Sequence, residues 1–253
     1  MQTSTTQSSP LPASSSASVA SHPWLMLISR SVLFILIQGL LALILMATGT
    51  RSALDESARW WMLIVSLANI ISIYFLVRLF SLEGKRYFDV IRFSRETWKT
   101  DLFWFVVASM VGIPIATVVK DPLAVAIFGD AMIPTTMMFR ELPTWAFILS
   151  FLFPITIAFA ELPTYFVYVM PRLEAQLKNG WIAWFIASFF LAAQHVFLPF
   201  IPDGGYLLWR LGMFLPFALF TGLVIKIRPS LAPYFLIVHG LMDVTVVLVY
   251  LMI

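Results

Sequence analysis

Apolar residues occur along this chain in seven runs of about 20 residues, separated by short polar segments. As a helix, a run of that length crosses the roughly 30 Å of hydrocarbon in a bilayer. The runs cover about residues 31–50, 60–80, 102–119, 142–170, 181–201, 206–225 and 231–253. This pattern predicts an all-α protein, a polytopic bundle of transmembrane helices.

Two features of the pattern qualify the number and shape of the spans. The segment 122–139 is apolar but is interrupted by Pro, Gly and Asp, so it predicts either a re-entrant segment or a short extra span. Seven or eight spans are therefore expected. Within the fourth run, Pro154 and Pro163 are expected to bend the helix, because proline removes a backbone donor.

The composition agrees with a membrane protein. Only 11% of residues are charged and 60% are hydrophobic, whereas a soluble domain has about 25% charged residues. The chain has no cysteine, which excludes thiol catalysis, disulfides and cysteine metal sites. Residues 1–22 are rich in Ser and Thr and lack charged side chains, which predicts a disordered tail.

The basic residues are concentrated in three loops, at 84–100, 172–178 and 226–228. With seven spans these loops lie on one side, which the positive-inside rule assigns to the cytoplasm. The prediction is a multi-pass protein of the plasma or inner membrane. Its N-terminus would be inside and its C-terminus outside.

The loop 84–100 alternates aromatic and basic residues. A basic cytoplasmic loop is the simpler interpretation, and an interfacial helix with its apolar side chains facing lipid is the alternative. Those side chains are Tyr87, Val90, Ile91 and Phe93. Nothing else in the sequence favours nucleic-acid binding, so membrane lipid is the partner expected here.

Four ionisable residues lie deep within the apolar runs, and such residues usually face a bundle interior and often mark function. They are Glu161, His195, His239 and Asp243. Glu161 and His239 each lie about 13 Å from the cytoplasmic end of their runs at 1.5 Å per residue. Asp243 follows His239 by four residues and therefore shares its helix face. Three helices are thus expected to bring these side chains to similar depths.

Several chemistries fit this set. A carboxylate beside an imidazole can activate water, and a second imidazole can hold a developing oxyanion, as in a hydrolase. Glu161, His195 and His239 are also ligand types of catalytic zinc, although the chain has no HExxH motif. A proton relay in a transporter is a third reading. The structural reading is that each group only bonds a neighbouring side chain or helix. Glu161 would then pair with Arg172 or Tyr165, and Asp243 would orient His239 or pair with Arg210.

The order and spacing of these residues resemble those of the type II CAAX prenyl endopeptidases and their bacteriocin-processing relatives, the CPBP or Abi family. That family has EExxxR, often followed by PRL, then FxxxH, then HxxxN or HxxxD. Here PRL is residues 171–173, LAAQH ends at His195, and HGLMD spans His239 to Asp243. Aligned on PRL without gaps, the first glutamate of the motif falls on Glu161.

The resemblance covers residues 143–253 and implies a catalytic core there, preceded by N-terminal membrane helices in 23–142. It implies a protease in which Glu161 activates water with help from His195. His239 and Asp243 would stabilise the oxyanion, and no cofactor would be required, with zinc as the alternative. The substrate would be a membrane-anchored protein or peptide, at an active site opening to the cytoplasm.

The sequence departs from the family pattern at three positions. Leu162 stands at the second glutamate, Phe166 at the arginine and Leu191 at the phenylalanine. A register shifted by one residue would place Ala160 at the catalytic position, and the chain would then be an inactive relative acting as a scaffold or immunity protein. A proton-coupled transporter is the alternative from another class.

Overall fold

The computed structural model describes residues 13–251, which are helical with no strand in that range. The α-helices are α1 (Ala13–Ala47), α2 (Ala53–Ala58), α3 (Trp61–Leu82), α4 (Tyr87–Val90), α5 (Trp98–Val118), α6 (Lys120–Phe128), α7 (Ile133–Met138), α8 (Thr144–Ser150), α9 (Leu152–Leu162), α10 (Met170–Leu177), α11 (Gly180–Ala193), α12 (Gly204–Ile227) and α13 (Ala232–Leu248). A π-helix η1 (Pro163–Val169) joins α9 to α10, and short 3₁₀ turns η2 (Gln194–Phe197), η3 (Pro229–Leu231) and η4 (Val249–Leu251) complete the described part.

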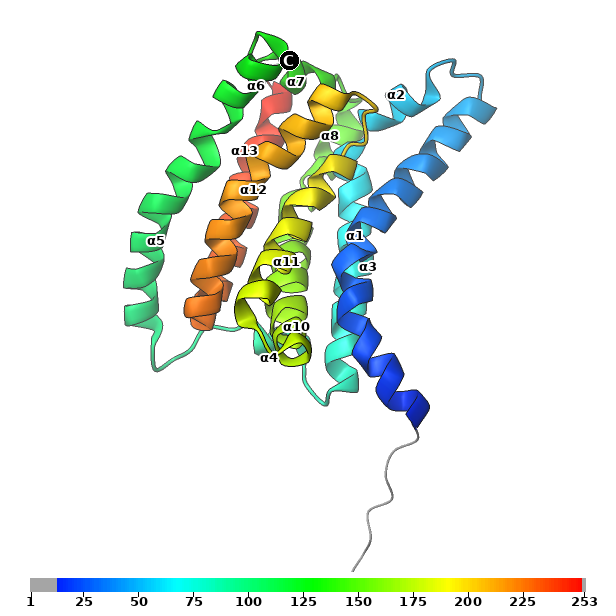
Figure 1. Ribbon diagram of the computed structural model, residues 1–253. Coiled ribbons are helices and arrows are strands. Elements are labelled where there is room, and N and C mark those ends of the chain that lie inside the picture. Colours follow the sequence, from blue (N-terminus) through cyan, green and yellow to red (C-terminus); the bar gives the residue numbers. More distant parts are fainter. Residues whose placement is uncertain (1–12, 252–253) are drawn as a thin grey trace, which may run out of the picture.

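Seven helical segments in this range are long and apolar enough to cross a membrane, which confirms the all-α polytopic bundle. They are Ser21–Ala47, Trp61–Leu82, Trp98–Phe128, Thr144–Leu177, Gly180–Phe197, Gly204–Ile227 and Pro229–Leu251. The segment 122–139 forms no eighth span, because α6 continues the third span and the six residues of α7 rise only about 9 Å. The beginning of the described chain and the C-terminus lie at opposite ends of the bundle (Figure 1).

The disordered tail expected at 1–22 only partly overlaps the described residues. Residues 1–12 lie outside the described residues, and α1 already begins at Ala13. The fourth span changes course near both of its prolines. The helix is interrupted at Phe151, before Pro154, and it widens into the π-helix η1 at Pro163.

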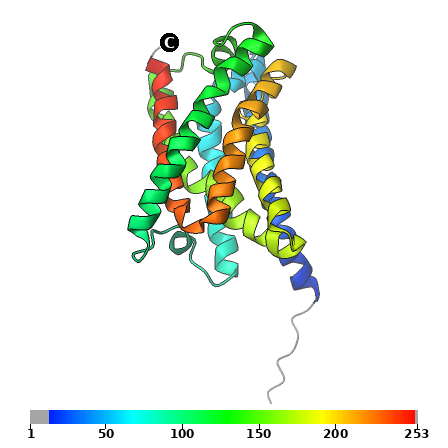
Figure 2. The ribbon, with the colours of Figure 1, turned by 60° about the vertical axis from the view of Figure 1, so that its left-hand side comes forward.

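The fourth span is central to the packing. Helix α9 packs against both α3 and α13, while α11 packs along α12. Helix α5 lies at the periphery beside α12 and α13, as Figures 1 and 2 show. At the base of α5 the buried Asp101 carboxylate binds Arg228 Nε and Ser230 Oγ, each at 2.7 Å. The fold thereby fixes one end of α5 to the start of the last span.

The expected interfacial helix in the basic loop is not formed as predicted. Only α4, four residues long, is helical there. Tyr87 and Ile91 are buried in the protein rather than facing lipid, and the Tyr87 hydroxyl donates a 2.5 Å hydrogen bond to the Phe159 carbonyl. The segment is thus mainly a loop and not an interfacial helix, and the hydrogen bond of Tyr87 to the fourth span holds it against the bundle.

A close contact between α13 and α9 holds His239 near the fourth span. A Cβ added at Gly240 would lie 2.8 Å from the Pro154 carbonyl oxygen and 3.1 Å from the Ala158 Cβ. We expect Gly240→Ala to lower the free energy of unfolding by ~1–3 kcal/mol, because the helices must separate. Thermal unfolding in detergent measures this. Gly39→Ala, where nothing lies within 4 Å of the added Cβ, is the matched control, and an equal loss in both variants would contradict the expectation.

The arginine of the PRL segment ties the fourth span to the second at the end that carries the basic loops. Arg172 Nε and Nη2 donate to the two carboxylate oxygens of Glu83 at 2.7 and 2.5 Å. Burial alone would raise the pKa of Glu83, but the hydrogen bonds and charge of Arg172 outweigh it and hold the pKa below its usual value. The pair therefore contributes stability above about pH 4.3, and this contribution is lost as the pH falls through the lowered pKa.

We expect Glu83→Gln to lower the free energy of unfolding by up to ~1 kcal/mol at pH 7, the range of a partly exposed ion pair. The difference between wild type and variant will shrink as the pH falls below about 4. Denaturation in detergent at several pH values measures both effects. Glu141→Gln, an exposed carboxylate, serves as control. A difference that grows in acid would contradict the assignment.

Candidate functional site

The four deep ionisable residues lie together in the structure. Glu161 Oε2 is 3.6 Å from His195 Nε2, and Glu161 Oε1 is 3.5 Å from His239 Nε2. His239 Nε2 is also 3.3 Å from Asp243 Oδ2 on the next turn of α13. Three spans thus bring one carboxylate between two imidazoles, within reach of proton transfer directly or through one water.

Local breaks in helix geometry present Glu161 and His195. Glu161 is at the last turn of α9, directly before Pro163 begins the wider π-helix, and such bulges are frequent at functional sites. Helix α11 ends in the tight turn η2, which carries His195. His195 Nδ1 lies 2.9 Å from the Leu191 carbonyl oxygen. Because a carbonyl only accepts, Nδ1 carries the hydrogen and Nε2 is left to face Glu161.

A fifth charged residue belongs to this group and was missed by the sequence reasoning. Arg30 of α1 is fully buried, and its Nη2 lies 3.5 Å from Glu161 Oε2. The hydropathy pattern places the start of the first span after Arg30, because this charge interrupts the apolar run. The span instead begins at Ser21. The apolar residues that precede Arg30 in the sequence were the signal that it lies inside the membrane.

Arg30 and Glu161 are joined by a network of buried amides. Arg30 Nε donates to Gln194 Oε1 at 2.7 Å, and Arg30 Nη1 donates to Asn69 Oδ1 at 2.8 Å. Gln194 Nε2 in turn donates to Glu161 Oε2 at 2.7 Å. The carboxylate is therefore held in one orientation by a cation and an amide, while its other oxygen faces His239.

Two of the positions that depart from the family pattern are buried beside Glu161. Phe166 and Leu162 are buried apolar side chains that line a small pocket with Glu161. The family motif has an arginine at the position of Phe166. In this chain the arginine that contacts Glu161 is Arg30, which comes from α1. Ala160, the alternative catalytic position, is buried and has no ionisable side chain. The carboxylate that faces the imidazoles is that of Glu161.

The Asp243 carboxylate contacts His239 and makes no ion pair with Arg210 among the described residues. Of the two alternatives, the contact with His239 is therefore the one present, and it is made to Nε2, the same nitrogen that faces Glu161, without forming a hydrogen bond.

The donor set fits a zinc ion poorly. Arg30 places positive charge 3.5 Å from the same Glu161 oxygen that faces His195, and a divalent cation there would be repelled. Within residues 21–251, no cluster of three or more His, Asp or Glu side chains is arranged to hold a metal ion.

A cavity of about 370 Å³ adjoins the site. Glu161, His195, His239 and Asp243 line it together with Arg210. Its apolar walls come mainly from α9, α12 and α13, and it reaches residues of α6 and α7 at the end of the bundle that holds the C-terminus. The volume is in the range of small-ligand sites and is large enough for part of a peptide.

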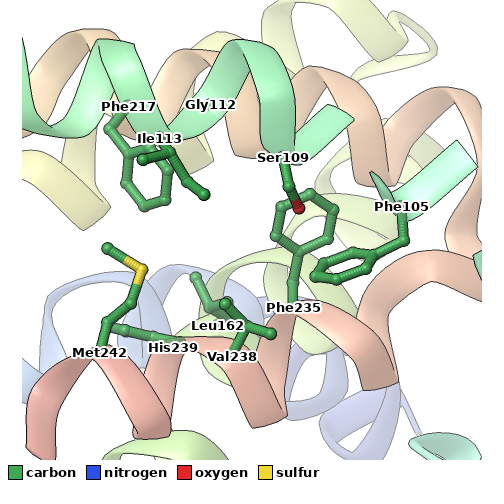
Figure 3. A pocket seen from close by; sticks show the side chains of 10 residues that line it. All are labelled: Phe105, Ser109, Gly112, Ile113, Leu162, Phe217, Phe235, Val238, His239 and Met242. Carbon is green, nitrogen blue, oxygen red and sulfur yellow. The ribbon is translucent and has the colours of Figure 1, made fainter. Parts of the chain in front are cut away.

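A smaller pocket approaches His239 from the side, between α5 and α13. Figure 3 shows Phe105, Ser109 and Ile113 of α5 facing Phe235 and Met242 of α13 across it. His239 and Leu162 also line it. His239 therefore borders this pocket as well as the larger cavity.

Comparisons of the chain with protein-family models, with curated proteins and with solved structures gave no match.

Proposed function

We propose that this protein is an intramembrane endopeptidase of the kind that its motifs resemble, which hydrolyses a peptide bond of a membrane-anchored protein or peptide. One observation carries the proposal. The Glu161 carboxylate lies 3.5 and 3.6 Å from the Nε2 atoms of His239 and His195, beside a cavity of about 370 Å³ inside an apolar bundle. A buried carboxylate between two imidazoles is suited to activating water.

The proposed reaction needs no covalent intermediate. Glu161 accepts a proton from a water molecule while the water oxygen adds to the carbonyl carbon of the peptide. His239, whose Nε2 lies beside both Glu161 and Asp243, hydrogen-bonds the developing oxyanion. The C–N bond then breaks, and the proton passes to the leaving nitrogen from Glu161 with the help of His195. Arg30 and Gln194 keep the carboxylate in place throughout.

The side of the membrane from which substrate reaches Glu161 is part of the proposal. If the basic loops face the cytoplasm, the cavity extends from Glu161 toward the opposite face, where α6 and α7 lie (Figure 1). This favours access from the non-cytoplasmic side over the cytoplasmic opening expected from the resemblance. Proteoliposomes of known orientation, given a peptide on one side at a time, show which face of the membrane admits the substrate.

The runner-up is a protein with the same fold that does not cleave. The observation favouring it is that Glu161 Oε2 already receives a hydrogen bond from Gln194 and faces Arg30, as in a structural ion pair. In that case Glu161 would stabilise the bundle and serve no reaction.

Purified protein and a library of membrane-tethered peptides test the proposal. We expect wild type to cleave peptides that the Glu161→Ala and His195→Ala variants leave intact, and we expect stringent chelation to leave cleavage unchanged. If wild type cleaves nothing that the folded variants spare, the endopeptidase proposal fails and the non-cleaving protein is preferred.

A further inference from the structure

Arg210 is a buried cation without a buried anion to balance it. Its side chain is 3% exposed, and no carboxylate of the described residues forms an ion pair with it. Other arginines that are buried or partly buried in the described range lie within 3.5 Å of a carboxylate. They are Arg30, Arg59, Arg140, Arg172 and Arg228.

The protein satisfies only part of the Arg210 guanidinium. Nε donates to the His195 carbonyl oxygen at 3.1 Å, and Nη2 donates to the Leu198 carbonyl oxygen. Within the described chain Nη1 has no hydrogen-bond partner. The guanidinium also lies over the rings of Phe214 and Trp209, 4.9 and 5.9 Å from their centroids. These contacts supply no anion, and because a buried charge is costly unless it is paired, the guanidinium points to an anionic partner outside this chain.

Arg210 also lines the cavity that contains the candidate site. It shares the cavity wall with Glu161 and His239, and its Nε is bonded to the backbone of His195, whose imidazole faces Glu161. An anionic group bound at Arg210 would thus lie in the same cavity as the Glu161 carboxylate. His195 lies between the two, because its backbone contacts Arg210 and its imidazole faces Glu161.

We propose that Arg210 binds the free C-terminal carboxylate of a peptide substrate in this cavity, an inference that rests on the proposed endopeptidase function. A carboxylate accepts two parallel hydrogen bonds from a guanidinium, which suits the unbonded side of Arg210.

The position of Arg210 favours a peptide carboxylate over a lipid phosphate. Arg210 is six residues from the start of α12 at Gly204, or about 9 Å along the helix axis. Lipid headgroups lie in the interfacial region outside the hydrocarbon core. The bound group would therefore have to leave the interface, which a peptide end in a cavity does more readily than a diester carrying two acyl chains.

Calorimetric titration in detergent with two forms of one short apolar peptide tests the site. One form ends in a free carboxylate and the other in an amide. We expect wild type to bind the acid at least ~10-fold more tightly, because a charge-assisted hydrogen bond is lost with the amide. Equal affinity for the two forms would overturn the proposal, and this comparison requires no variant.

Two variants and one control test whether Arg210 causes the preference for the acid peptide over the amide peptide. We expect Arg210→Met to lose it, Arg210→Lys to keep part of it, and Arg78→Gln, at an exposed arginine, to keep all of it. If Arg210→Met does not fold, the Lys variant replaces it. A full preference in a folded Arg210→Met protein would overturn the assignment.

Lipid competition and cleavage complete the test. Loss of acid-peptide binding in nanodiscs of phosphatidylglycerol, but not of phosphatidylcholine, would assign Arg210 to a lipid phosphate and overturn the proposal. A wild type that prefers the acid but cleaves no peptide keeps the carboxylate site and rejects the endopeptidase. A wild type that cleaves acid and amide peptides equally well keeps the endopeptidase and rejects the site.

Discussion

Glu161→Gln is expected to lower the rate of peptide cleavage by about 10³-fold, within the range of 10²–10⁴ that a general base contributes. The amide has nearly the shape of the carboxylate but cannot accept the proton of the attacking water. The measurement is the initial rate of cleavage of a tethered peptide at saturating concentration, with the substrate found in the library screen.

Glu174→Gln is the matched control for this variant. Glu174 lies on α10 in the same span, its side chain is 49% exposed, and it pairs with Lys226 far from the imidazoles. We expect that variant to cleave at the wild-type rate. A Glu161→Gln protein that keeps its activity would show that another group activates the water, and the proposed mechanism would then be wrong.

Replacement of Arg30 by glutamine is expected to lower the free energy of unfolding by ~3–5 kcal/mol, the usual cost of removing one partner of a buried ion pair. The variant leaves the buried Glu161 carboxylate without its cation, and it disturbs the amides of Gln194 and Asn69. Denaturant unfolding in detergent measures the loss. Arg78→Gln is the control, since an exposed substitution usually changes stability by less than ~0.5 kcal/mol.

A double variant separates the two roles of Arg30. If its main role is to balance Glu161, then Arg30→Gln combined with Glu161→Gln will be less destabilised than the sum of the two single variants, because no unpaired charge remains. Simple additivity would mean that Arg30 acts through Gln194 and Asn69 instead, and that its charge is not what holds the carboxylate.

The class of fold and most of the residues deep in the membrane could be predicted from the sequence alone. The thickness of a bilayer sets the length of an apolar helix, so seven runs of suitable length gave seven spans regardless of how they pack. The cost of a charge in hydrocarbon made Glu161, His195, His239 and Asp243 stand out. These constraints act on each span separately, and they can therefore be read along the chain.

Which groups meet depends on the tertiary structure. Arg30 and Glu161 are far apart in the sequence, and their contact depends on the rotation of α1 against the fourth span. The inward position of Tyr87 and the unpaired state of Arg210 likewise depend on neighbours from other helices. In a bundle the partner of a polar side chain is set by interhelical packing. The pattern along one helix shows that a polar group is buried, and packing determines what it binds.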